Sequence, residues 1–217
     1  MPNAYSDDQI TIEVLRDLGS FGNNAYLLRP ADGGAVTVVD VPEGSEAIVE
    51  ALGDTPVERI VVTHSHFDHW GGFDVVRAHT AAAVFAGAEE TKLESSRDIQ
   101  PLPHDAEFSV GAATVRVIHT PGHTPGSICL HVGDAVLTGD TLFPGGPGRS
   151  GSPEALQQEI DSITKRLYPL ADATAVLPGH GDPTTIGASQ AEYAVFASQQ
   201  HPADLQGDVL WTEAQTA

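Results

Sequence analysis

The stretch RIVVTHSHFDHWGG, residues 59–72, joins an uninterrupted apolar run to a cluster of polar side chains. Ile60, Val61 and Val62 are contiguous β-branched residues, the pattern of a strand that is covered on both faces. Such a strand needs packing layers on both sides, so the chain is expected to fold as a sheet layered with helices. Three histidines and one aspartate then follow within residues 64–69. A strand end of this kind presents loop side chains on a rigid rim.

Short β-branched runs alternate with helical patterns along the rest of the chain. Strands are expected at 9–15, 24–29, 35–41, 57–63, 82–86 and the start of 173–182, with hairpins over 108–120 and 127–140 that turn at Gly111 and Gly133. Helices are expected at 42–54, about 72–78, 88–95, 152–170 and 188–200, with Ser45 and Ser152 as caps. Two β-rich halves, each with helices, predict an α/β fold, specifically a four-layer αββα sandwich.

Size and charge limit what the chain can do. Its 217 residues, 41% of them hydrophobic, suffice for one good core, so residues 1–217 are expected to form a single domain. The 30 acidic and 10 basic residues give a formal charge of −20 without a basic cluster, and we expect no nucleic-acid partner. The chain opens without a leader pattern and has no apolar run long enough for a membrane span. We therefore expect a cytoplasmic protein that acts on a small-molecule substrate.

Potential metal ligands stand at several predicted strand ends, each beside glycine or proline. Zinc and related ions bind imidazole nitrogen and carboxylate oxygen. Because Cys129 is the only cysteine, a thiolate cluster is excluded. A single histidine at a strand end would more simply be a packed or helix-capping residue. The whole set instead predicts a metal centre built from His64, His66, Asp68, His69, His123, Asp140 and His180.

The same motifs resemble those of the metallo-β-lactamase superfamily. THSHFDHWGG matches its H-x-H-x-D-H signature, and HTPGHTPGS, GDTLF and LPGH match its later ligand motifs in order. GNNAYLL and VTVVDVPEG are similar to the family's first strands, so the resemblance covers most of the chain. It implies the αββα fold and a binuclear centre. By position, one divalent ion would be held by His64, His66 and His123, a second by Asp68, His69 and His180, and both by the bridging Asp140.

A centre of this kind has a defined chemistry. Two divalent ions, zinc in the first place with iron or manganese as alternatives, lower the pKa of a bound water to about 7, so metal-bound hydroxide attacks a carbonyl. The ions also polarise that carbonyl and can receive a leaving thiolate. The resemblance implies catalytic roles for Asp140, as the bridge, and for Asp68, which would orient the nucleophile.

Within the superfamily, HTPGHTPGS and GDTLF most resemble the hydroxyacylglutathione hydrolases, or glyoxalase II enzymes, which hydrolyse thioesters. The resemblance implies a binuclear metal-dependent hydrolase, a glyoxalase II-like thioesterase acting on a small acyl-thiol. Full-length glyoxalase II enzymes grip glutathione with basic side chains of a C-terminal region, whereas here no Lys or Arg follows Arg166. The chain is thus more similar to short glyoxalase II-like proteins, whose thiol carrier need not be glutathione.

Two residues beside the ligand motifs are candidates for substrate binding. Arg149, in FPGGPGRSG, can contact a substrate carboxylate or only brace a glycine-rich loop. Phe143 closely follows Asp140 and can line a pocket or pack in the core.

A different reaction class fits the same ligands. His64, His123 and Asp140 form a two-histidine, one-carboxylate set that suits a mononuclear Fe(II) centre, and persulfide dioxygenases of the superfamily resemble that arrangement. Their loop after the bridging aspartate usually continues Gly-Arg-Thr-Asp-Phe, whereas this chain reads GRSGSPE, which favours the hydrolase. A lactonase is a third candidate, because a metal hydroxide also attacks esters. A purely structural role for the metals is disfavoured, since a core of this size does not need them.

Overall fold

Two β-sheets form the centre of the fold in the computed structural model, which describes residues 3–90, 92–93 and 98–212. The first sheet runs in chain order: β1 (Asn3–Ser6), β2 (Ile10–Leu18), β3 (Asn23–Pro30), β4 (Val36–Val39), β5 (Val57–Val62), β6 (Ala83–Gly87) and β7 (Ile99–Leu102). The second has the order β15 (Thr184–Thr185), β14 (Ala175–Pro178), β11 (Ala135–Gly139), β10 (Ile128–Val132), β9 (Ala113–His119) and β8 (Glu107–Val110). A short hairpin joins β12 (Leu142–Phe143) to β13 (Gly146–Pro147).

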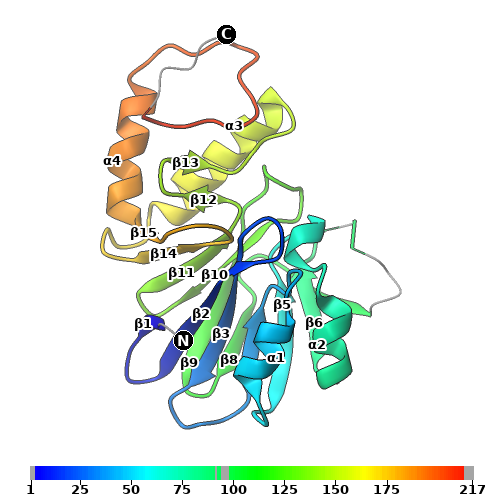
Figure 1. The fold of residues 1–217 in the computed structure, drawn as a ribbon. Coiled ribbons are helices and arrows are strands. Elements are labelled where there is room, and N and C mark those ends of the chain that lie inside the picture. The colour runs from blue at the N-terminus through cyan, green and yellow to red at the C-terminus, as the bar shows by residue number, and fades with distance from the viewer. Residues whose placement is uncertain (1–2, 91, 94–97, 213–217) are drawn as a thin grey trace.

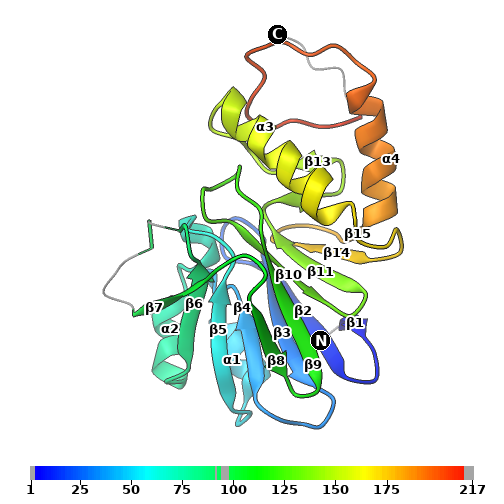
Figure 2. The ribbon, with the colours of Figure 1, turned by 180° about the vertical axis from the view of Figure 1, so that it is seen from behind.

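Helices cover the outer face of each sheet (Figures 1 and 2). Helices α1 (Glu46–Leu52) and α2 (Phe73–His79) pack on the first sheet through one apolar cluster. Helices α3 (Pro153–Ser162) and α4 (Ile186–Ala197) pack on the second through another. A third cluster lies between the sheets, where Ile12 and Val61 of the first meet Val117 and Leu137 of the second. The layers are those of the predicted αββα sandwich, which is confirmed.

Most of the predicted elements are present, with two local differences. Ser45 stands at the N-cap position of α1, but its hydroxyl donates to the Pro42 carbonyl at 2.6 Å and does not cap the helix. Ser152 does cap α3, accepting from the backbone N–H of Ala155. The helix expected over 88–95 is not found in residues 88–90 and 92–93, which form turns and bends; the rest of that span lies outside the described residues.

A π-helical turn, Ile163–Leu167, extends α3, and a 3₁₀ turn, η1 (Phe67–His69), follows β5. None of the helices in the described residues is both long and apolar enough to cross a membrane.

Parallel strand pairs bring the ligand motifs together. β4 pairs with β5 in the first sheet, and β11 pairs with β14 in the second, both in parallel. The carboxyl ends of parallel strands lie at one edge of a sheet, so the residues after β4, β5, β11 and β14 share a rim. The two sheets are joined at this rim, because Asn23 at the start of β3 forms an isolated bridge to His180 after β14.

Candidate metal centre

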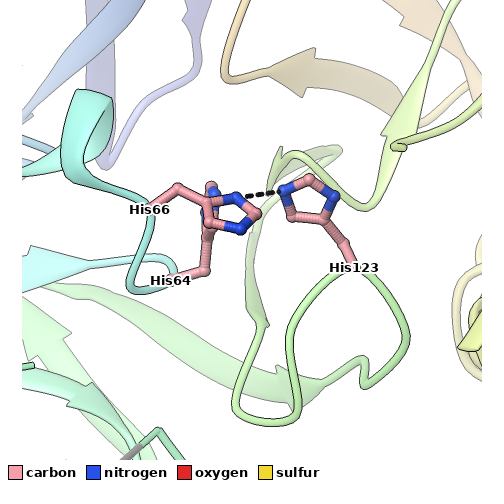
Figure 3. Close-up of side chains that lie close together, drawn as sticks. All are labelled: His64, His66 and His123. Carbon is pink, nitrogen blue, oxygen red and sulfur yellow. Dashed lines mark hydrogen bonds between the residues drawn. The ribbon is translucent and has the colours of Figure 1, made fainter. Parts of the chain in front are cut away.

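Three histidines form the first group of the centre (Figure 3). His64 and His66 leave the end of β5, and His123 comes from the loop between β9 and β10. His66 Nδ1 lies 2.8 Å from His123 Nε2, and the ring of His64 lies 4.9 Å and 4.7 Å from theirs, centre to centre. The nitrogens of three imidazoles therefore converge on one small volume, the donor set that zinc and iron bind.

A second group contains Asp68, His69 and His180. The 3₁₀ turn after β5 carries Asp68 and His69, while His180 follows β14 on the other sheet. His180 Nε2 lies 3.2 Å from Asp68 Oδ2 and 3.3 Å from His69 Nε2. Two ring nitrogens and a carboxylate oxygen thus face one another across the two sheets.

Asp140, directly after β11, lies between the two groups. Its Oδ1 is 3.2 Å from His69 Nε2, and its Oδ2 is 3.7 Å from His123 Nε2 and 3.5 Å from His180 Nε2. It also forms a potential ligand group of its own with His64 and His69, one member from each of the other groups. The structure therefore brings all seven predicted ligands into one continuous cluster.

Hydrogen bonds on the far side of the rings fix which nitrogen faces the cluster. The Nδ1 atoms of His69, His123 and His180 donate to Asp40 Oδ2 at 2.8 Å, to the Arg149 carbonyl at 3.0 Å and to the Phe21 carbonyl at 3.1 Å. Each of these rings therefore carries a proton on Nδ1 and directs Nε2 at the cluster. Such outer hydrogen bonds orient metal-binding histidines in proteins and raise their basicity.

Asp40 and Asn23 support the cluster, although neither was predicted from the sequence as a site residue. Asp40 directly follows β4 and has a φ of 59°. Besides the His69 ring, its carboxylate accepts from the N–H and the hydroxyl of Thr63, both at 2.8 Å. Asn23 donates to Asp68 Oδ2 at 3.0 Å. The motif VTVVDVPEG contains Asp40, and the motif GNNAYLL contains Asn23. The position of Asp40 at a predicted strand end was the sequence signal that could have identified it as a site residue.

Electrostatics divides the cluster into a neutral half and a charged half. Burial lowers the pKa of His64 well below 6.5 and also lowers the pKa values of His66 and His123, so these imidazoles are neutral near pH 7. His180, in the other half, behaves differently. Burial disfavours its protonated form, but hydrogen bonds to Asp140 and Asp68 outweigh the effect of burial and raise the pKa of His180 to about 9. The imidazoles of the first histidine group are therefore uncharged, so an ion can bind them without displacing an imidazolium proton.

In the charged half, ionised carboxylates lie close to protonated imidazole rings. Burial opposes the charge of Asp68, but hydrogen bonds from His180 and Asn23 outweigh it and lower its pKa to about 2. For His69 burial is again outweighed, here by Asp140 and Asp40, which raise its pKa well above 6.5. Burial likewise opposes ionisation of Asp140, but His69 and His180 bring its pKa well below 3.8. The protons on His69 and His180 supply the positive charge that a divalent ion would bring.

The residues present fit a metal pair. His64 Nε2 is buried and finds no hydrogen-bond partner among the described residues. Its Nδ1 lies 3.2 Å from the Thr63 hydroxyl, which itself donates to Asp40 and so accepts from the ring. A buried nitrogen lone pair without a partner is unfavourable unless an electrophile takes it. The donor set of imidazoles and carboxylates suits zinc, iron or manganese.

A cavity of about 330 Å³ opens beside the cluster, with His123, Asp140 and His180 in its wall. Both predicted substrate-binding residues, Arg149 and Phe143, line it. The remaining lining residues belong to the β12–β13 hairpin and the segment after it, and to Asp208, Val209 and Leu210 near the C-terminal end of the described chain. Residues 208–210 were not predicted from the sequence to belong to the site.

Glu159 is a further buried carboxyl beneath this region. It lies on α3, is fully buried, and accepts the backbone N–H of Gly148 at 3.1 Å through Oε1. Its Oε2 has no hydrogen-bond partner among the described residues. Burial raises its pKa to about 9, so the side chain is a neutral acid at pH 7. It supports the loop that carries the Arg149 carbonyl, the acceptor of His123.

The chain is similar to known proteins over most of its length. It is 34% identical over 199 residues to the hydroxyacylglutathione hydrolase of Cereibacter sphaeroides (strain ATCC 17023), covering 89% of this chain and 72% of that protein. The ETHE1 structure from Myxococcus xanthus superposes with a TM-score of 0.74 at 27% identity, covering 87% of this chain and 85% of the other. The structure of TTHA1623 in a di-iron-bound form gives 0.69 at 27% identity, covering 82% and 96%.

The sequence profile of the metallo-β-lactamase superfamily matches residues 18–180, which include all seven candidate ligands. The αββα layers and the convergence of those ligands at one rim agree with that match. The chain belongs to the metallo-β-lactamase superfamily.

Proposed function

We propose that this protein is a binuclear metal-dependent hydrolase of thioesters, similar to glyoxalase II. The observation that carries the proposal is the position of Asp140, whose two carboxylate oxygens reach ligands of both groups within 3.7 Å. One carboxylate shared in this way is suited to bridging two ions. The 34% identity to a hydroxyacylglutathione hydrolase supports a thioester as the substrate class.

In this proposal each residue of the cluster has a stated role. His64, His66 and His123 would hold one ion, Asp68, His69 and His180 the other, and Asp140 both. When bound, the two metal ions supply a nucleophile near neutral pH and polarise the substrate carbonyl. Zinc is the ion we propose first, with iron or manganese as alternatives, and the similar di-iron structure supports including iron.

The protein's own groups orient the reaction. The Asn23 amide holds Asp68 Oδ2 at 3.0 Å, and the low pKa of Asp68, about 2, keeps this carboxylate ionised, so that it would orient the attacking water. The Asp40 carboxylate holds the ring of His69. Phe143 and Arg149 line the adjoining cavity, where they would contact the substrate.

Thiol release tests the proposal. The purified protein should bind about two zinc-type ions per chain and release thiol from acyl thioesters, followed with a thiol-reactive dye. Loss of thiol release on chelation, with recovery on adding zinc, is the expected control. Opening of lactones without turnover of any thioester would contradict the proposal and indicate a lactonase.

A mononuclear iron dioxygenase acting on persulfides is the second candidate. His64, Asp140 and His123 supply two imidazoles and a carboxylate in the same cluster, and the likeness to the Myxococcus xanthus ETHE1 structure fits this alternative. One iron per chain with oxygen uptake on a persulfide, and no thiol release from thioesters, would favour it over the hydrolase.

A further inference from the structure

Outside the metal cluster, the cavity wall is formed by two segments far apart in the sequence. Backbone N–H groups of Ser150 and Gly207 donate to each other's carbonyls at 3.1 Å, and the N–H of Trp211 donates to the Gly145 carbonyl at 2.8 Å. Trp211 is fully buried in the apolar cluster that also contains side chains of α3 and α4. Residues 208–210 are therefore held in place as part of the wall and are not a loose tail.

The charge of this wall is balanced. Apart from the candidate metal ligands, Arg149 and Asp208 are the charged side chains among the described residues that line the cavity. Arg149 Nε lies 3.8 Å from Asp208 Oδ2, and both side chains are exposed at the rim. An exposed pair of this kind attracts weakly. Any carboxylate that approaches the guanidinium must nevertheless also approach Asp208, which repels it.

The rest of the wall is apolar. Phe143, Pro144, Pro147 and Leu210 face the cavity beside His180, and the ring of Phe143 lies 6.4 Å from that of His180. The most exposed large apolar side chains of the described residues are Phe21, Phe67, Leu210 and Val195. Of these, Leu210 lines the cavity, together with Phe143 and the two prolines. Apolar side chains that line a cavity and are partly exposed mark a surface that binds an apolar ligand.

We infer that the site selects substrates whose group next to the metal cluster is uncharged and apolar, and that Asp208 discriminates against anionic groups such as the carboxylates of glutathione. The inference rests on the proposed function, because it names the substrate class of the same site. Leu210 and Phe143 would contact the apolar group. Asp208 would offset Arg149, whose guanidinium belongs to the described residues that line the cavity.

Binding of two non-hydrolysable thioethers tests the inference without any turnover. S-octylglutathione carries a net negative charge, and S-octyl-N-acetylcysteamine is neutral with the same alkyl chain. Isothermal titration of the zinc-loaded protein should show at least 10-fold tighter binding of the neutral thioether. Asp208→Asn should tighten binding of the anionic thioether about 3- to 10-fold and change binding of the neutral one less than about 2-fold. Leu210→Ser should weaken binding of the neutral thioether about 3- to 10-fold.

Matched variants separate local effects from general ones. Asp204→Asn removes the same charge from the same exposed segment outside the cavity lining, and Val195→Ser removes an exposed apolar side chain on α4. Neither should change the ratio of the two affinities. Equal binding of both thioethers by the unaltered protein, or equal effects of Asp208→Asn and Asp204→Asn, would overturn the inference. A protein that binds the thioethers as expected but hydrolyses no thioester would instead contradict the proposed function alone.

Discussion

His69 Nδ1 and Asp40 Oδ2 are joined by a 2.8 Å hydrogen bond in which both side chains are almost completely buried. The bond holds the imidazole with Nε2 directed at Asp140 and Asp68. Asp40 is itself held by the backbone and hydroxyl of Thr63. The ring of one candidate ligand is thus positioned by a residue that follows a different strand.

Asp40→Ala should weaken metal binding at the group of Asp68, His69 and His180. Loss of an outer partner of a metal-binding histidine typically costs about 10- to 100-fold in affinity. Competition with a chromogenic chelator measures it, and the exposed Asp54→Asn serves as the control for a change of charge. Unchanged affinity for both ions in a folded Asp40→Ala protein would show that the hydrogen bond from His69 to Asp40 does not orient the His69 ring for metal binding.

Asp140→Ala should weaken both metals together, because the carboxylate contacts ligands of both groups. Elemental analysis after dialysis should find less than about one ion per chain, against about two in the unaltered protein. Asp68→Ala is the comparison, since Asp68 belongs to the second group alone and should cost mainly one ion. Two retained ions after Asp140→Ala would refute the bridging role.

Metal binding should release protons and should strengthen as the pH rises. In the metal-free protein the pKa of His180 is about 9 and that of His69 is well above 6.5, so both rings are protonated at pH 7 and must lose those protons to bind an ion. Titration calorimetry at pH 7 in buffers of different ionisation enthalpy should report about two protons released. His180→Ala should reduce this number by about one. No proton release at pH 7 would contradict the charged state of the second group.

The raised pKa of His180 also predicts the pH dependence of metal-free stability. Its folded-state value, about 9, is above the ordinary 6.5, so the stabilisation is fully present below pH 6.5 and is lost as the pH rises through 9. Urea unfolding in the presence of chelator should show this loss. His180→Ala should flatten the curve between pH 6.5 and 9, and an unchanged slope would be the contrary result.

Glu159→Gln should stabilise the metal-free protein above about pH 5. Burial raises the folded-state pKa of Glu159 to about 9, so between pH 4.5 and 9 the unfolded chain ionises while the folded state keeps its proton, and stability falls as the pH rises. The neutral amide keeps an acceptor for the Gly148 N–H and removes this penalty, on the order of 3 kcal/mol at pH 7. Urea unfolding at pH 4.5, 7 and 9 measures the difference. The exposed Glu107→Gln should show no such trend.

Much of the fold could be predicted because its signals are local. The contiguous residues Ile60, Val61 and Val62 do form a strand buried between layers, and Ser152 does cap its helix. Ser45 shows the limit of a local pattern: its hydroxyl is taken by the nearby Pro42 carbonyl, a bond that depends on how the chain enters the helix. The short hairpin of β12 and β13 was missed because two-residue strands carry no periodicity.

The sequence by itself determined the superfamily, the layered architecture and the set of candidate ligands, since these depend on motifs and on residue patterns within single segments. Only the tertiary structure decided what surrounds those ligands. Asn23 reaches His180 across 157 positions, and Arg149 meets Asp208 at the rim of the cavity. Such pairs leave no mark in the sequence, because the attraction between two side chains depends on their distance in space, which the packing of the two sheets sets.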